Sequence, residues 1–122
     1  MTKILVVDDT PMDQRLVGRL LEKNSNLEAI FAGNGKEALA VIAKESPDIV
    51  LTDLQMPEMD GLEATRAIRV RLAPEKQPHI VAMTANAMQG DREMCIKAGM
   101  NDYVSKPIQV RALRKAIEGA KK

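Results

Sequence analysis

The strongest constraint on the fold of this chain is a regular alternation of short apolar runs with longer segments of helical periodicity. The apolar runs are rich in Ile, Val and Leu and cover residues 3–7, 27–32, 48–52, 79–84 and 102–105. The helical pattern occupies residues 11–24, 35–45, 61–72, 87–99 and 108–120. Strands that alternate with helices in this way form parallel sheets, because each helix carries the chain back across the sheet.

The apolar runs differ in a way that predicts their places in the sheet. The first, third and fourth runs are almost continuously apolar, as expected of central strands covered on both faces. The second run contains Glu28 and the fifth is short and polar, so both are predicted to be edge strands. Five strands are too few for an eight-stranded barrel. The pattern therefore predicts an open, doubly wound α/β sandwich that forms a single domain over residues 1–122.

The helical segments each carry an apolar stripe that can cover the sheet. The first segment places four apolar side chains on one predicted face: Leu16, Val17, Leu20 and Leu21. Thr10 is its expected N-cap and Pro11 its first helical residue, whereas the fourth helical segment is expected to end at Gly99.

Composition excludes several classes of protein. The formal net charge is +1, and only Phe31 and Tyr103 could stack on bases, so direct nucleic-acid binding is not expected. Cys95 is the sole cysteine and forms no internal disulfide. No apolar stretch approaches the roughly 20 residues that span a bilayer, and no secretion signal opens the sequence. We therefore expect a cytoplasmic domain without direct membrane contact, which a longer membrane-bound chain could also carry.

Polar side chains stand at the carboxyl ends of four of the predicted strands: Asp8 and Asp9, Asp53, Thr84 and Lys106. In open α/β sheets, ligands bind at this edge. Three carboxylates that converge there would repel one another unless a cation lies between them. A small set of oxygen ligands without sulfur or imidazole suits Mg²⁺, with Mn²⁺ as an alternative ion.

The same residues can carry phosphoryl chemistry. Lys106 offers a positive charge and Thr84 a hydroxyl donor for phosphoryl oxygens, and Asp53 is the geometric choice for a carboxylate nucleophile. Each residue also has a simpler interpretation. Asp53 could end a strand, Asp9 could help to cap the first helix, Thr84 could be a core hydroxyl, and Lys106 could be a solvated surface lysine.

Four segments in this order, "ILVVDD", "LTDLQMPEMDG", "MTAN" and "DYVSKP", resemble the receiver domain of two-component response regulators and hybrid histidine kinases. The resemblance extends over residues 3–119. It implies a flavodoxin-like five-stranded parallel sheet of order 2-1-3-4-5. The segments "MTAN" and "DREMCIKAGMNDYVSKPI" are more similar to receivers of hybrid kinases than to those fused to DNA-binding domains.

The resemblance also implies roles for the site residues. Asp53 would accept a phosphoryl group from a phosphohistidine of a histidine kinase or histidine phosphotransfer domain. Asp8, Asp9, Asp53 and the backbone carbonyl of Gln55 would hold Mg²⁺. Thr84 and Lys106 would grip the phosphoryl oxygens. Tyr103 would turn inward together with Thr84, which couples the site to the surface formed by the segments at 87–99, 102–105 and 108–120, also a candidate homodimer surface.

Further expectations follow from the same family. Gln55 and Asn86 stand where the family tunes the lifetime of the phosphate. The predicted helix at 11–24 and the loop after Lys106 would contact the phosphodonor protein through six residues: Met12, Arg15, Leu16, Arg19, Pro107 and Ile108. Such a domain is a regulatory phosphoacceptor and not an enzyme, although limited self-phosphorylation from small donors and self-dephosphorylation are expected.

Three other functions are compatible with this fold class. An aspartyl-phosphate phosphatase or phosphotransferase would carry a second Asp two residues after the nucleophile, where this chain has Gln55. A phosphorylation-independent interaction domain would not need the set formed by Asp9, Asp53, Thr84 and Lys106. A flavodoxin-like cofactor binder would need amide and hydroxyl donors after the first strand, where "DDTP" is acidic.

Overall fold

The computed structural model describes residues 2–9, 11–22, 27–53, 61–72, 77–84, 89–105 and 110–120. Five strands form one parallel sheet: β1 (Thr2–Val7), β2 (Leu27–Ala32), β3 (Ile49–Asp53), β4 (His79–Thr84) and β5 (Asp102–Ser105). Five helices alternate with them: α1 (Pro11–Glu22), α2 (Gly35–Glu45), α3 (Gly61–Arg71), α4 (Gln89–Ala98) and α5 (Val110–Ala120). Within these described ranges, no helix combines the length and the apolar character that crossing a bilayer requires.

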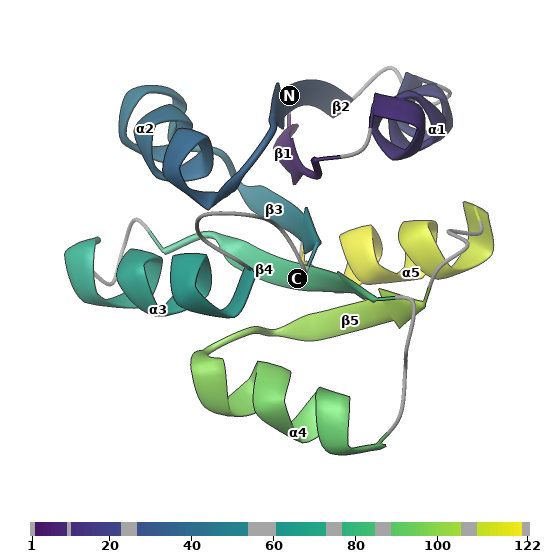
Figure 1. Ribbon diagram of the computed structural model, residues 1–122. Helices are drawn as coiled ribbons and strands as arrows, with labels where there is room; N and C mark the ends of the chain where they lie inside the picture. Colours follow the sequence, from purple (N-terminus) through teal and green to yellow (C-terminus); the bar gives the residue numbers. More distant parts are fainter. Residues whose placement is uncertain are drawn as a thin grey trace.

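The strand order is β2-β1-β3-β4-β5. The doubly wound α/β fold with strand order 2-1-3-4-5 is therefore confirmed (Figure 1). The strands with near-continuous apolar sequence, β1, β3 and β4, are the three central ones, and β2 and β5 are the edges, as their composition predicts. All five residues of β3 are buried, so Asp53 ends a strand that is covered on both faces.

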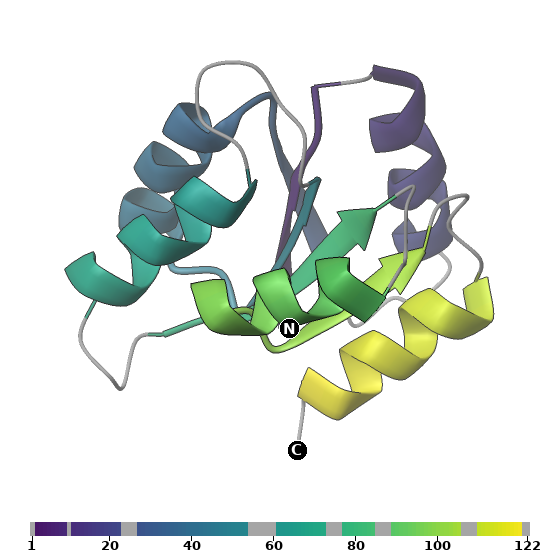
Figure 2. The same cartoon turned by 60° about the horizontal axis from the view of Figure 1, so that its bottom comes forward.

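The helices divide between the two faces of the sheet (Figures 1 and 2). Helices α1 and α5 cover one face, where Val17 and Leu113 pack with alternate strand residues such as Ile4 and Leu51. The other face packs against α2, α3 and α4. Because successive strand side chains point to opposite faces, a central strand needs apolar residues at every position to fill both cores.

Local signals explain where particular helices begin and end. The side chain of Asn34 accepts a hydrogen bond from the Glu37 backbone N–H at 2.9 Å and so caps the start of α2. Gly99 follows the last residue of α4 with φ of +106°, a conformation that glycine adopts without the steric penalty of a Cβ atom. The prediction that α4 ends at Gly99 is thus confirmed. The expected N-cap Thr10 lies outside the described residues.

Only part of the apolar stripe predicted for the first helix covers the sheet. Val17 and Leu21 are buried in the core, but the side chain of Leu16 is 40% exposed. Four apolar residues at positions 16, 17, 20 and 21 span a wider arc than the contact with the sheet, so one flank of the stripe remains in solvent. Other differences are small: β1 begins one residue earlier than predicted, and β3 runs from 49 to 53 and not from 48 to 52.

At the amino edge of the sheet, Arg69 of α3 joins three segments. Its guanidinium donates to the Gly99 carbonyl at 2.8 Å and to the Asn101 side chain at 2.7 Å. It also donates to the Gln77 side chain at 2.8 Å and to the Pro78 carbonyl at 2.9 Å. This network ties the end of α3 to the segments that precede β4 and β5.

Candidate functional site

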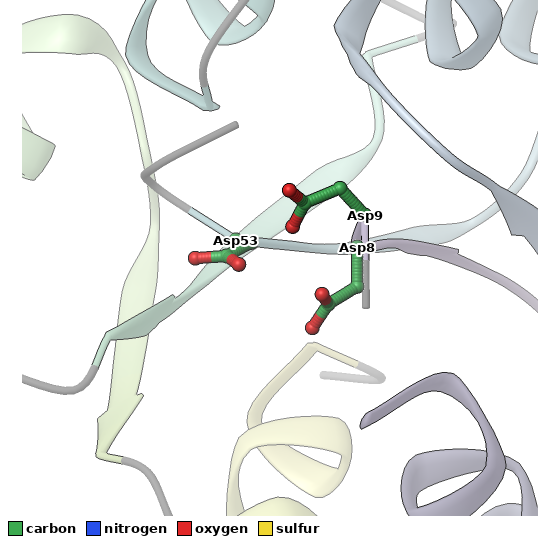
Figure 3. Close-up of side chains that lie close together, drawn as sticks. All are labelled: Asp8, Asp9 and Asp53. Carbon is green, nitrogen blue, oxygen red and sulfur yellow. The ribbon is translucent and has the colours of Figure 1, made fainter. Parts of the chain in front are cut away.

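The site lies where β1 and β3 end side by side. The two strands are parallel neighbours with Val7 opposite Thr52, so continuing this register places Asp8 beside Asp53. Asp8 and Asp9 extend from the end of β1 and Asp53 from the end of β3 (Figure 3). Asp53 is 44 or more positions away from Asp8 and Asp9 in the sequence, and it meets them because neighbouring parallel strands end at the same edge of the sheet.

The three carboxylates form one cluster. A carboxylate oxygen from each of Asp8, Asp9 and Asp53 lies within 4.8 Å of the others. Asp8 is fully buried and Asp53 is 9% exposed, whereas Asp9 faces solvent. Like charges this close in a partly dry environment repel one another, and a cation among them reverses the sign of that interaction.

The donor set fits Mg²⁺. Its members are all hard carboxylate oxygens, and the exposed position of Asp9 leaves the cluster open on one side to water and further oxygen ligands. No sulfur or imidazole belongs to this cluster, so among the described side chains it offers none of the softer ligands that zinc and copper favour.

Backbone contacts hold the ends of the two strands. The Asp8 N–H donates to the Ala32 carbonyl at 3.1 Å, which continues the pairing of β1 with β2 beyond Val7. The buried hydroxyl of Thr52 donates to the carbonyl oxygen of Asp53 at 3.1 Å. Asp53 therefore projects from a backbone that is restrained by both the sheet and the preceding side chain.

Two residues near the carboxylate cluster, Thr52 and Gln14, were not predicted from the sequence. The sequence signal for Thr52 was its polar side chain in an otherwise apolar strand. Gln14 lies in the first half of α1, and its side-chain amide reaches back to the carbonyl oxygen of Asp8 at 2.6 Å. A glutamine that follows paired aspartates at a helix start can fold back onto the strand end, but its partner is a backbone atom and leaves no sequence signal.

The remaining predicted site residues are only partly described. Thr84 ends β4 and pairs through its backbone with Ser105, but its side chain is outside the described part of the structure. Tyr103 lies in β5, half-buried against the core under α2, α3 and α4. Lys106 and four further predicted residues also lie outside the described ranges: Gln55, Asn86, Pro107 and Ile108.

The predicted partner residues of α1 lie on its outer surface. Met12 is 77% exposed, and Arg15, Leu16 and Arg19 are exposed as well. Arg15 and Arg19 also line a shallow groove between α1 and β2 whose far wall is the partly exposed ring of Phe31. Both are basic side chains beside the apolar Met12 and Leu16, a combination that suits a protein partner.

Comparison with known proteins identifies the family. A family model for the response regulator receiver domain matches residues 4–118. The chain belongs to this family. The receiver is 40% identical over 121 residues to hybrid signal transduction histidine kinase H of Dictyostelium discoideum. The matched region covers 97% of this chain. It spans only 9% of that kinase, so this curated relative is a much longer protein.

Solved structures agree with this assignment. The receiver domain of the sensor histidine kinase PA1611 from Pseudomonas aeruginosa PAO1, with a magnesium ion coordinated in its active-site cleft, is 34% identical. It has a TM-score of 0.86, and the match covers 99% of this chain and 98% of that one. The receiver domain of Ssk1 of Saccharomyces cerevisiae, crystallised with the histidine phosphotransfer protein Ypd1, is 30% identical with a TM-score of 0.86. That match covers 95% of this chain and 86% of the other.

The family settles the general role of the domain. It is a receiver domain of two-component phosphorelay signalling, homologous to the receivers of hybrid histidine kinases. Receivers of this kind are regulatory phosphoacceptors that pair with histidine kinases or phosphotransfer proteins.

Proposed function

We propose that this receiver accepts a phosphoryl group on Asp53 from a phosphohistidine of a histidine kinase or phosphotransfer domain, in a step that depends on Mg²⁺. The observation that carries the proposal is the cluster of Asp8, Asp9 and Asp53, whose oxygens lie within 4.8 Å of one another at the carboxyl edge of the sheet. The pairing of Ypd1 with the Ssk1 receiver supports a phosphotransfer protein as the donor.

The transfer itself is a displacement at phosphorus. A carboxylate oxygen of Asp53 attacks the phosphorus atom and forms a P–O bond while the bond from phosphorus to the donor imidazole nitrogen breaks. The electron pair of that bond returns to the imidazole. The burial of β3 along its whole length supports this role, because a restrained Asp53 would lower the entropic cost of reaching the transition state.

Asp8, Asp9 and Asp53 would hold the metal, together with the backbone carbonyl of Gln55. When bound, Mg²⁺ supplies positive charge that offsets both the carboxylates and the charge on the transferring group. Thr84 and Lys106 would hold the phosphoryl oxygens, as hydroxyl and ammonium donors. Gln55 and Asn86 are uncharged amides and provide no base that activates water. The lack of such a base at these two positions would set the lifetime of the phosphate.

The signal would leave the site through Thr84 and Tyr103. A new phosphoryl charge attracts the Thr84 hydroxyl, and Tyr103 repacks toward the space that this opens. The surface of α4, β5 and α5 would change as a result and could support a homodimer.

The phosphodonor would bind at α1 and the loop after Lys106, through six residues: Met12, Arg15, Leu16, Arg19, Pro107 and Ile108.

We also propose that residues 1–122 act as one cytoplasmic receiver unit, with limited self-phosphorylation from small phosphodonors and self-dephosphorylation. The rival function is a phosphorylation-independent interaction domain of the same fold. The acidic cluster favours phosphorylation, because an interaction domain gains nothing from three mutually repelling carboxylates at a buried edge.

Incubation with acetyl phosphate and Mg²⁺, followed by intact mass measurement, tests the proposal. The wild type should gain one phosphoryl group, and Asp53→Asn should gain none while keeping its circular dichroism spectrum. Asp48→Asn is the matched control and should gain one phosphoryl group as the wild type does. Asp48 precedes β3 at the opposite edge of the sheet and is exposed. An unmodified wild type, or an equal mass gain in Asp53→Asn, would exclude phosphorylation on Asp53.

A further inference from the structure

We propose that Gln14 is a positioning residue for the cation site, and that its side-chain amide determines how tightly Asp8 and Asp9 hold the ion. The inference rests on the proposed Mg²⁺ site and adds a residue from α1 that is not itself a ligand. Gln14 acts through the backbone, by holding the peptide group that joins the two aspartates.

The contacts of Gln14 are specific. Its Nε2 atom lies 2.6 Å from the carbonyl oxygen of Asp8 and 3.3 Å from that of Ala32. A carbonyl oxygen only accepts hydrogen bonds, so the amide nitrogen and not its oxygen must face both partners. A single amide nitrogen therefore connects the end of β1 with the end of β2.

These bonds restrain the backbone from which the carboxylates extend. The Asp8 carbonyl belongs to the peptide group that ends at the Asp9 nitrogen, and Gln14 holds this carbonyl from the side of α1. The N–H of Asp8 is held in turn by the Ala32 carbonyl at 3.1 Å. With both flanking peptide groups restrained, the direction of the Asp8 Cα–Cβ bond is fixed, and so is the position of the Asp9 Cα atom, which lies in the plane of the second peptide group.

This restraint is important because the metal-free cluster of carboxylates is electrostatically unfavourable. Before a cation binds, the carboxylates of Asp8, Asp9 and Asp53 repel at their separation of 4.8 Å or less. Asp8 is buried among its neighbours, but Asp9 is exposed and could turn away into water. Holding the Asp8–Asp9 peptide in its binding geometry lowers the cost of collecting the ligands around an ion.

The decisive variant is Gln14→Met, which keeps the length of the side chain and removes both donors. Titration with MgCl₂, followed through backbone amide resonances, gives the Kd for Mg²⁺ without any phosphodonor. We expect Kd to rise about tenfold, as for other residues that orient metal ligands. The amide resonance of Asp9 should also shift in the metal-free variant, because its peptide group loses a hydrogen bond.

Phosphorylation by acetyl phosphate provides a second readout. In Gln14→Met the Mg²⁺ concentration for half-maximal rate should rise by about the same tenfold factor, whereas the rate at saturating Mg²⁺ should stay near that of the wild type. A purely structural role for Gln14 would lower the melting temperature without this separation of half-saturation from maximal rate.

Gln77→Met is the matched control. Gln77 also donates from its side-chain amide to backbone carbonyls, among them Leu72 at 2.8 Å, but at the opposite edge of the sheet. This variant should lose stability and keep the wild-type Kd. If Gln14→Met folds poorly, Gln14→Ala is titrated in the same way.

The outcomes separate the inference from the proposed function. A wild type that neither binds Mg²⁺ nor becomes phosphorylated would overturn the proposed function. A wild type that does both, with an unchanged Kd in Gln14→Met, would overturn the role of Gln14 alone. An equal loss of affinity in Gln77→Met would likewise overturn it, since the effect would then follow stability and not position.

Discussion

Single residues in this receiver take their properties from neighbours that are distant in the sequence. His79 opens β4 at the edge opposite the acidic cluster. Burial lowers the pKa of His79, Asp102 opposes this by raising it, and the nearby Arg69 lowers it further. The net direction is downward, so the folded protein favours neutral His79 at pH values where an unfolded chain would begin to bind a proton.

This shift predicts a pH dependence of stability. The unfolded chain, in which His79 has its usual pKa of about 6.5, binds the proton more readily than the folded protein. The free energy of unfolding should therefore be unaffected by His79 above that value, and should decrease as pH falls from it through the lowered pKa of the folded state.

Urea denaturation at about pH 7.5 and about pH 5.5, the two sides of this window, measures the effect. His79→Gln should lose less stability between the two values than the wild type does. An NMR titration that places the pKa of His79 at or above its usual value would contradict the prediction.

At the scale of elements, one guanidinium connects the end of α3 with the segments that precede β4 and β5. Arg69 donates to Gly99, Gln77, Pro78 and Asn101, four partners that lie in the segments before β4 and β5. Asn101 in turn accepts from the Ile80 N–H at 2.8 Å, so the cluster extends into β4. The planar fork of arginine reaches these partners together, which a single ammonium group cannot do.

Arg69→Lys should therefore destabilise the fold although it conserves charge. We expect a loss of about 1–3 kcal/mol in the free energy of unfolding, because several charge-assisted hydrogen bonds disappear and part-buried acceptors lose a partner. Urea denaturation measures the loss. Arg71→Lys, an exposed position on the same helix, is the control and should change stability by less than about 0.5 kcal/mol. Equal stabilities for the two variants would show that the fork geometry is unimportant.

At the scale of the whole molecule, cation binding and folding should be coupled. The carboxylate cluster exists only when β1 and β3 are paired, so an ion that binds it stabilises the folded state alone. The proposed site predicts that MgCl₂ raises the melting temperature of the wild type.

Asp9→Asn should remove most of this increase, since it takes away a ligand at the exposed position of the cluster. At 100 times the Kd, the stabilisation of the wild type should be about 2.7 kcal/mol. Thermal unfolding with MgCl₂ or with EDTA tests this. Glu118→Gln on the exposed surface of α5 is the control, and it should retain the full response. A response in Asp9→Asn equal to that of the wild type would place the ion elsewhere.

The fold was largely predictable because its signals are local and periodic. The alternation of apolar runs and helical segments places all ten elements, and the continuous apolar character of the first, third and fourth runs identifies the central strands. The meeting of Asp8, Asp9 and Asp53 follows from the same pattern, because residues at the carboxyl ends of neighbouring parallel strands share an edge.

Other features could not be predicted from the pattern. The exposure of Leu16 depends on how much of α1 the sheet covers, which is a property of packing and not of the helix. Thr52 donates to a backbone carbonyl, which every residue type carries. A side chain with such a partner has no complementary residue that the sequence could reveal.

The sequence by itself determined the class of fold, the family and the acidic residues at the strand ends, since each is encoded in residue types at short or regular spacing. Only the tertiary structure decided that Gln14 reaches the Asp8 carbonyl and that Arg69 joins Gly99 to Asn101. These contacts arise where segments 6 to 32 residues apart meet. The packed geometry selects the partners of side chains that form such contacts, and the sequence alone does not specify them.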